Sequence, residues 1–278
     1  MDIAEIREIS KKCNNDIVET AIAFEREKTG KTTETLYENM EKMWIAMKKS
    51  AHKGVNEPVY SKSGMTGCEG YKLYSKSHGE YEKAAAIAMG VANINSAMGR
   101  IVAAPTAGSC GILPGVLCIM KERTGCDDKK IVAALFAAGL IGEFIADKAS
   151  IAGACHGCQA ECGSASAMAA AAAVWLCGGT IDQSFDAAAM SLKAIMGLVC
   201  DPVAGLVEVP CIKRNAFGAA EAILAADMAL AGIKSVIPFD ETVMAMKQAG
   251  ELMNDDLKET SRGGLAVTKT AKEWEQKL

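Results

Sequence analysis

Three of the eleven cysteines in this chain of 278 residues stand at positions where Gly or Pro interrupts a helical pattern. Cys158 lies in a Gly-Cys-Gln phrase, Cys200 precedes an Asp-Pro pair, and Cys211 follows a proline. Thiolates at irregular helix edges are readily stabilised, and thiolates are ligands for iron–sulfur clusters and for zinc. Three thiolates from separate loops can hold a [4Fe–4S] cluster while leaving one iron free. Spacing alone leaves zinc open, because Cys155 and Cys158 also form a Cys-x-x-Cys pair.

Two short loops rich in Gly, Ser and Thr are candidates for binding a substrate. They offer hydroxyl groups and unhindered backbone N–H groups, and the second loop precedes an expected helix near Gly111, whose N-terminus suits a carboxylate. The alternative is that their glycines only form turns. The candidate substrate-binding residues are Ser63, Thr66, Gly67, Thr106, Gly108 and Ser109.

The general base is expected among a small set of side chains. Of the three histidines, His156 lies two residues before Cys158, although a structural role is an equal alternative. Lys62 is the second candidate, and a residue of a partner subunit is a third. Arg214 and Asn215, next to Cys211, are expected either to orient substrate or to cap a helix. Cys155 and Cys162 are predicted to be packing residues.

The elements that must position these residues are predicted to be helices. Apolar residues recur at spacings of three and four, and no convincing strand pattern is present. Residues 56–79 are expected to form one long loop, and residues 1–55 a peripheral helical layer. Three of the predicted helices that follow are Glu82–Met98, Ala160–Leu176 and Asn215–Leu230. Three more are predicted from their caps: one capped by Asp127–Asp128 that runs through Ala146, one with a Thr180–Gln183 capping box that runs to Met196, and one capped by Asp240 that runs through Met253.

Composition supports this fold and excludes several functions. Half of the residues are hydrophobic but only 5% are aromatic, so the core must consist mainly of Ala, Ile, Leu, Val and Met, which suits closely packed helices. The sequence therefore predicts a compact all-α multi-helix domain over residues 1–278, in which irregular Gly/Pro loops form the cluster site.

The charge and the cysteine content indicate where the protein acts. The net charge of −4, without a long basic stretch, argues against binding to nucleic acid or to an acidic membrane surface. No segment qualifies as a membrane span or a secretory signal, so a cytoplasmic protein is expected. In a reducing cytoplasm, metal binding is favoured over a disulfide framework.

The chain contains several longer phrases: Gly157-Cys-Gln-Ala-Glu161, Gly197-Leu-Val-Cys-Asp-Pro-Val-Ala-Gly-Leu-Val-Glu-Val-Pro-Cys-Ile-Lys-Arg-Asn215, Ala104-Pro-Thr-Ala-Gly-Ser109, Ser61–Gly70 and Lys258–Ala266. These phrases resemble the iron–sulfur-dependent L-serine dehydratases (L-serine ammonia-lyases). They cover nearly the whole chain, and its length resembles that of the separate α subunit of the two-subunit form. The resemblance implies that Cys158, Cys200 and Cys211 ligate a [4Fe–4S] cluster in an all-helical domain.

The resemblance also implies an activity, a partner and a metabolic role. The expected reaction is dehydration and deamination of L-serine to pyruvate and ammonia, with the open iron acting as a Lewis acid on the substrate hydroxyl and carboxylate. A separate β subunit is expected, and amino-acid degradation feeding gluconeogenesis is the implied role. No lysine context resembles a pyridoxal phosphate site. The alternatives are a related lyase acting on L-cysteine or L-threonine, or a non-catalytic cluster- or zinc-binding redox sensor.

One departure from the family pattern concerns the fourth iron. Single-chain relatives carry a cysteine at the extreme C-terminus, shortly after the Gly-Gly-Leu-Ala phrase, that can occupy this iron. Here the segment Val267–Leu278 contains no cysteine. Three protein ligands are therefore predicted, with the fourth iron open or held by water or another group.

Overall fold

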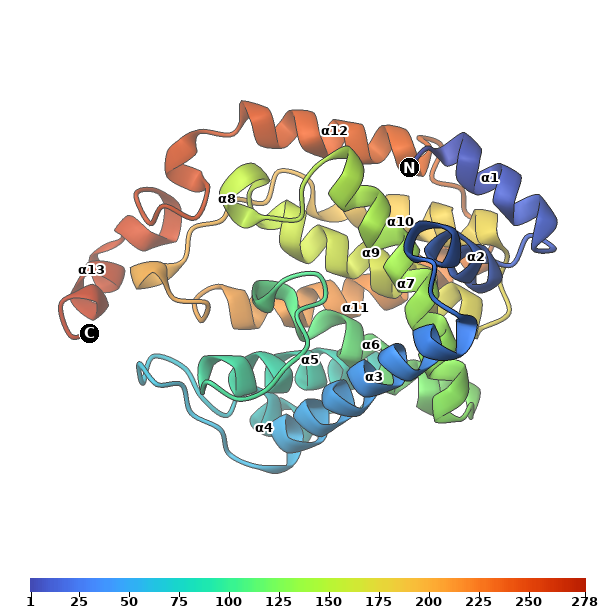
Figure 1. The fold of residues 1–278 in the computed structure, drawn as a ribbon. Coiled ribbons are helices and arrows are strands. Elements are labelled where there is room, and N and C mark those ends of the chain that lie inside the picture. Colours follow the sequence, from blue (N-terminus) through green and yellow to red (C-terminus); the bar gives the residue numbers. More distant parts are fainter.

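The computed structural model describes all residues 1–278 and contains only helices, turns and irregular backbone, apart from two isolated β-bridges. The predicted all-α fold is confirmed (Figure 1). The α-helices are α1 Ile3–Lys12, α2 Ile17–Thr29, α3 Thr33–Asn56, α4 Glu69–Tyr74, α5 Glu80–Ser96, α6 Ile112–Thr124, α7 Asp128–Lys148, α8 Gly153–His156, α9 Ser164–Leu176, α10 Ile181–Ile195, α11 Cys211–Leu230, α12 Phe239–Leu252 and α13 Lys269–Glu275. Short helical turns are η1 Ala107–Ser109, η3 Val203–Gly205, η4 Asp255–Leu257 and η5 Gly264–Val267, and η2 Gln159–Gly163 is a π-helix.

Helix α9 lies at the centre of the molecule (Figure 1). Its sequence is mostly Ala and Ser, and every residue except Trp175 is buried. It packs against α6, α7, α10 and α11, because side chains this small allow neighbouring helix backbones to approach closely. The composition-based prediction of a core of small residues therefore describes the helix to which the candidate site is attached.

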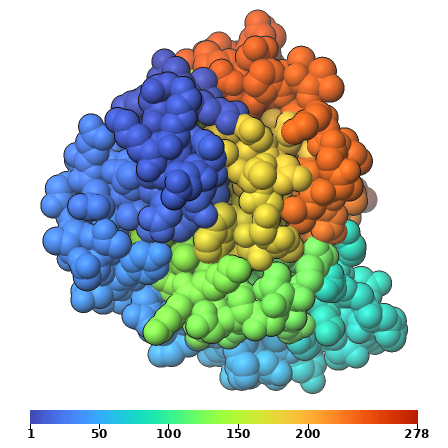
Figure 2. Space-filling model, turned by 90° about the vertical axis from the view of Figure 1, so that its right-hand side faces the viewer, coloured from blue at the N-terminus to red at the C-terminus, as the bar shows by residue number.

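Helices α1 to α3 lie against the outside of this core. Figure 2 shows the N-terminal segment on the surface beside the segment that contains α10. An ion pair joins Arg7 of α1 to Asp182 of α10. Trp175 Nε1 of α9 donates a hydrogen bond of 2.9 Å to Asp16 Oδ2, which caps α2. Ile6 and Trp44 nevertheless belong to the main hydrophobic core, so this layer packs on the rest of the chain through apolar contacts.

Two of the predicted helix starts are confirmed by their caps. The Asp127 side chain accepts a hydrogen bond from Lys130 N at the start of α7, and Thr180 and Gln183 form a capping box at the start of α10. Two others are wrong. Helix α11 begins at Cys211, four residues before Asn215, and α12 begins after Pro238, so that Asp240 lies in its first turn instead of capping it.

The segment 56–79 is not one long loop, because it contains the short helix α4. This helix packs closely on α5, where Gly70 contacts the backbone of Gly90 with no space for a Cβ atom between them. Its six residues are too short a run to show an apolar repeat, which is why the helix was not predicted.

The irregular segments gather at one end of the bundle, around α8, η2, η3 and the C-terminal tail. Cys200 forms an isolated parallel bridge with Lys258, so the tail runs beside the Cys200 segment. No helix in the chain has both the length and the apolar character needed to cross a membrane.

Candidate active site

The structure brings the three predicted cluster cysteines together from three separate segments. Cys158 precedes η2, Cys200 lies in the bridge to the tail, and Cys211 is the first residue of α11. All three are buried. Burial, followed by the charge of Cys158, raises the pKa of Cys200 well above its usual range. The same two causes raise the pKa of Cys211 to about 12. The three thiols are therefore within electrostatic range of one another.

Thiols are the usual ligands of iron–sulfur clusters, and these three come from separate segments. No group of three or more His, Cys, Asp or Glu side chains converges closely enough to hold one metal ion. A four-iron cluster binds each thiolate at a different iron, so its ligands need not converge on one point. Contact with Cys162, and then the charge of Arg214, lower the pKa of Cys158 despite its burial, which favours a thiolate at this position. Cys158, Cys200 and Cys211 are thus suited to hold three irons.

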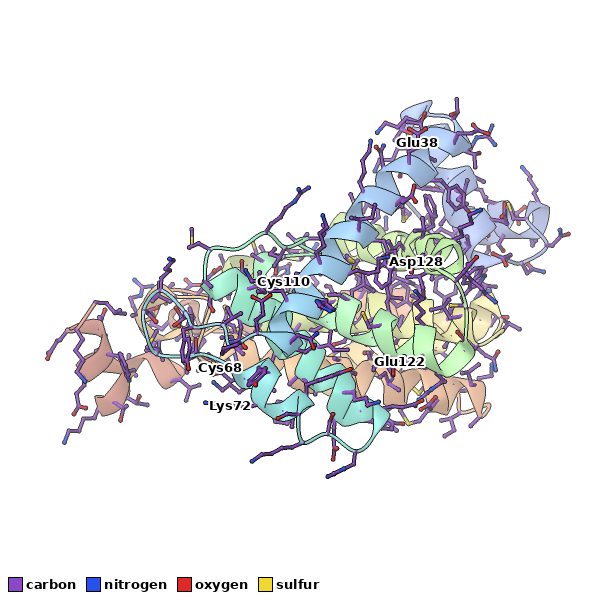
Figure 3. All side chains as sticks on the ribbon, turned by 90° about the horizontal axis from the view of Figure 1, so that it is seen from below. Glu38, Cys68, Lys72, Cys110, Glu122 and Asp128 are labelled. Atoms are coloured by element: carbon purple, nitrogen blue, oxygen red, sulfur yellow. The ribbon has the colours of Figure 1, made fainter.

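The other cysteines include one close neighbour of this group. Cys162 is buried, and its Sγ lies 3.4 Å from Cys158 Sγ, whereas Cys155 is exposed. Cys68 precedes α4 and Cys110 precedes α6 (Figure 3). Burial raises the pKa of Cys110 to about 12, as expected of a cysteine that serves as a small core residue.

A glutamate that was not predicted lies beside the cysteines. Glu161 Oε1 accepts a hydrogen bond of 2.8 Å from Thr106 Oγ1, and Glu161 Oε2 lies 3.9 Å from Cys200 Sγ. Burial raises the pKa of this carboxyl, and the charge of Glu259 acts in the same direction. Glu161 therefore connects a predicted substrate loop to a predicted cluster ligand.

The loop that contains Thr106, Gly108 and Ser109 is held in place by α11. Asn215 Nδ2 donates to Gly108 O at 2.7 Å, and Asn215 Oδ1 accepts from Gly111 N at 2.8 Å. Thr106 and Ser109 are 3.2 Å apart through their hydroxyl oxygens. The Asn215 side chain is fully buried, and both the NH2 group and the carbonyl oxygen of its amide are used in these internal contacts. Its place in the structure is that of a residue that positions the loop.

The second predicted substrate loop is attached to the same cysteine segment. Ser63 Oγ and Thr66 Oγ1 each donate a hydrogen bond of 2.8 Å to Glu208 Oε2. Glu208 is buried and lies three residues before Cys211. Gly67 forms a bridge to Tyr60 and closes the loop. The two hydroxyl groups thus hold the loop on the Cys200–Cys211 segment.

Arg214 and the C-terminal tail meet around Asp201. Arg214 donates hydrogen bonds to Val199 O at 2.8 Å and to Asp201 Oδ1 at 2.9 Å. The other carboxylate oxygen of Asp201 accepts from Leu265 N at 2.8 Å. Because this side-chain ion pair is mostly buried, Arg214 is held close to the cysteines in a fixed orientation.

The two candidate bases lie apart from these contacts. His156 is buried with its ring against Gly250 of α12, burial lowers its pKa, and its Nδ1 has no hydrogen-bond partner. Lys62 is exposed, and its backbone N–H donates to Ser96 O. No hydrogen bond joins either side chain to a cysteine or to Thr106.

Sequence reasoning thus assigned no role to Glu161, Glu208 or Asp201, although all three stand inside the phrases that carry the family resemblance. A signal was present: each is an acidic residue in a mostly apolar phrase at a Gly- or Pro-marked break. Buried acidic residues in such places usually have specific partners. These partners lie far away in sequence: Thr106 is 55 residues from Glu161, Thr66 is 142 residues from Glu208, and Leu265 is 64 residues from Asp201. Spacing in the sequence could therefore not identify them.

Comparison with known proteins places these residues in a family context. A family model described as "Serine dehydratase alpha chain" matches residues 12–266. The chain is 47% identical over 284 residues to the "Probable L-serine dehydratase, alpha chain" of Bacillus subtilis (strain 168), covering 100% of this chain and 94% of that protein. It is 54% identical over 177 residues to the protein of the same description from Latilactobacillus sakei, covering 64% and 85%. It is 37% identical over 258 residues to the "L-serine dehydratase" of Streptomyces coelicolor, covering 89% of this chain and 57% of that protein.

Proposed function

The chain belongs to the serine dehydratase alpha chain family, and from this premise we propose that it is the catalytic chain of an L-serine ammonia-lyase. The reaction converts L-serine to pyruvate and ammonia. One observation carries the proposal: three buried thiols from separate segments, Cys158, Cys200 and Cys211, lie next to a carboxylate that also contacts a hydroxyl-rich loop.

The proposed cofactor is a [4Fe–4S] cluster held by these three cysteines. When bound, it supplies a Lewis-acidic iron for the hydroxyl and carboxylate of the substrate. Such help is needed because hydroxide is a poor leaving group and the Cα–H bond is weakly acidic. Two of the three cysteines, Cys200 and Cys211, lie in a segment that Glu208 and Asp201 fasten to its surroundings.

The protein itself binds and orients the substrate. The hydroxyls of Thr106 and Ser109, with the backbone at the buried Gly108, are proposed to receive the substrate carboxylate. Asn215 keeps this loop at a fixed distance from the start of α11, so the substrate is presented to the cysteine group in one orientation. The aminoacrylate product tautomerises and hydrolyses in water without further help from the protein.

The residue that accepts the Cα proton stays a prediction, with His156 and Lys62 as the candidates from this chain. Replacement of His156 by Gln and of Lys62 by Met, one at a time, distinguishes them. The base is the residue whose loss abolishes kcat while the visible absorption of the cluster is unchanged. Retention of kcat in both variants would assign the base to a partner subunit.

A separate β subunit is the proposed partner. The relatives that match this chain over most of their length are named alpha chains. The L-serine dehydratase of Streptomyces coelicolor is longer, and this chain spans 57% of it. A cytoplasmic location is proposed because reducing conditions keep the thiols available for a cluster.

The test is anaerobic purification of the chain with and without the β subunit. A brown protein with broad visible absorption that is bleached by air is expected, together with pyruvate formation from L-serine. Replacing Cys158, Cys200 or Cys211 by Ser should abolish the absorption, whereas the same change at Cys13 or Cys177 should not. If the reconstituted pair makes no pyruvate from L-serine or L-cysteine and no 2-oxobutanoate from L-threonine, the catalytic proposal fails and a non-catalytic sensor is favoured.

A further inference from the structure

Glu161 is placed at the meeting point of the substrate loop and the cysteine group. It lies in the π-helix η2, three residues after Cys158, and π-helical turns are frequent at functional sites. One carboxylate oxygen is 2.8 Å from Thr106 Oγ1, and the other is 3.9 Å from Cys200 Sγ. A substrate bound between Thr106 and Cys200 would therefore lie against this carboxylate.

Two glycines make space for the Glu161 side chain. A Cβ atom on Gly108 would lie 3.0 Å from Glu161 Oε1, and a Cβ atom on Gly153 would lie 2.8 Å from Glu161 Oε2 and 2.9 Å from Cys200 Sγ. Real Cβ atoms rarely come so close. The backbone segments on both sides of the carboxylate are thus as small as the chain allows, and the carboxylate stays partly accessible between them.

Glu161 has no cationic partner in the chain. None of the seventeen ion pairs in the structure includes Glu161. Arg214, the nearby cation, is engaged with Asp201 and with a backbone carbonyl. A largely enclosed carboxylate without a cation is costly, because its desolvation is not offset by a charge partner.

We propose that Glu161 binds the α-ammonium group of the substrate and thereby selects β-hydroxy amino acids over hydroxy acids that lack an amino group. The proposal rests on the proposed function, and it adds the group that recognises nitrogen. An ammonium ion supplies both the missing positive charge and hydrogen-bond donors for Glu161. The substrate hydroxyl and carboxylate are left for other partners, so the three polar groups of serine are recognised separately.

The test compares two ligands that differ only in this group, L-serine and 3-hydroxypropanoate. Binding of each to the cluster-loaded enzyme with its β subunit is measured anaerobically by rapid mixing, from the change in the visible absorption of the cluster before L-serine is consumed. In Glu161→Gln, the Kd for L-serine should rise about 30-fold or more, as expected for loss of an enclosed charge partner. The Kd for 3-hydroxypropanoate should change less than about threefold.

Two further variants separate direct contact from other roles. Glu161→Asp keeps the charge but shortens its reach, and should weaken L-serine binding while leaving 3-hydroxypropanoate unaffected. Glu259→Gln removes an exposed carboxylate that lies near enough to influence Glu161, and should change L-serine binding less than about threefold.

Three results would overturn the assignment. Equal weakening of both ligands in Glu161→Gln would mean that the residue only supports the Thr106 loop. Equal loss of L-serine binding in Glu161→Gln and Glu259→Gln would mean that only the general negative field matters. Loss of the cluster absorption in both Glu161 variants would mean a structural role. Failure of the proposed function is a different result, because the unaltered enzyme would then make no pyruvate whatever the Glu161 variants bind.

Discussion

Glu221 is expected to make the stability of this protein depend on pH. It lies on α11, and its carboxylate accepts a hydrogen bond of 2.9 Å from Ser191 Oγ of α10. Burial raises its pKa from 4.5 to about 8, although the hydroxyls of Ser191 and Ser166 act in the opposite direction. At neutral pH the folded chain therefore holds a proton that the unfolded chain has released.

The direction of the effect follows from proton linkage. Between pH 4.5 and about pH 8 the folded state binds one more proton than the unfolded state, so the free energy of unfolding falls as pH rises through this window. Glu221→Gln keeps the shape of the side chain and removes the titration. Relative to the unaltered protein, the variant should gain about 3 kcal/mol between pH 5 and pH 8.

Thermal unfolding followed by circular dichroism at pH 5, 6, 7 and 8 measures this gain. About 2 °C of Tm per kcal/mol is expected for a chain of this size, so the Tm advantage of Glu221→Gln should grow by about 6 °C from pH 5 to pH 8. Glu241→Gln, on the exposed side of α12, is the matched control and should show no such trend. A Tm difference that is constant with pH, or that shrinks toward pH 8, would refute the reasoning.

Three further perturbations test other parts of the structure. Gly153→Ala would push a methyl group against the Glu161 carboxylate and should lower the iron content of the reconstituted protein at least severalfold. Gly139→Ala is the control, because its new Cβ would meet only one atom at 3.8 Å, and it should bind iron normally. Equal iron content in the two variants would contradict the close packing around Gly153. Asn215→Ala should lower the free energy of unfolding by about 2–4 kcal/mol in urea titrations, because Gly108 O and Gly111 N lose their hydrogen-bond partner. A loss below about 0.5 kcal/mol would show that water replaces the side-chain amide. Asp128→Asn should lower the free energy of unfolding by at most about 1 kcal/mol, because the contacts of Asp128 with two lysines are partly exposed. These lysines hold the pKa of Asp128 well below its usual range, so its contribution to stability is present above the ordinary pKa and is lost only in strong acid. Persistence of the full effect in 1 M salt would argue against an ionic origin.

Those parts of the fold that rest on local signals could be predicted from the sequence. Asp127 and Thr180 each cap a helix through hydrogen bonds within three residues, and the sequence locates both starts. The start of α11 was predicted too late because Pro210 and the residues after it read as a loop, although a proline is compatible with the position before a first helical turn. Helix α4 was missed because it has only six residues and packs on α5 through Gly70 and Leu73, which is too short a run to show an apolar repeat.

The candidate site was easier to predict in its cysteines than in its connections. Cys158, Cys200 and Cys211 could be singled out by their phrases, and they lie within electrostatic range of one another, while their role as cluster ligands stays a prediction. The role of Glu161 depends on contact with Thr106, which lies in a different loop, and no local pattern specifies such a pairing. Asn215 was predicted to orient substrate or to cap a helix, whereas its amide joins α11 to the 106–111 loop.

The residues between Cys200 and Asn215 hold the whole site together through side chains. Asp201 binds the backbone of the C-terminal tail, Glu208 binds the hydroxyls of the 61–67 loop, and Asn215 binds the backbone of the 106–111 loop. Each contact joins one distant segment to the segment that carries two of the three predicted cluster ligands. These three polar side chains help to fix the relative positions of the segments, together with backbone hydrogen bonds such as those between Cys200 and the tail. A shift of the cysteine segment would therefore be transmitted to both predicted substrate loops, which couples the geometry of the predicted cluster ligands to that of the predicted substrate-binding residues.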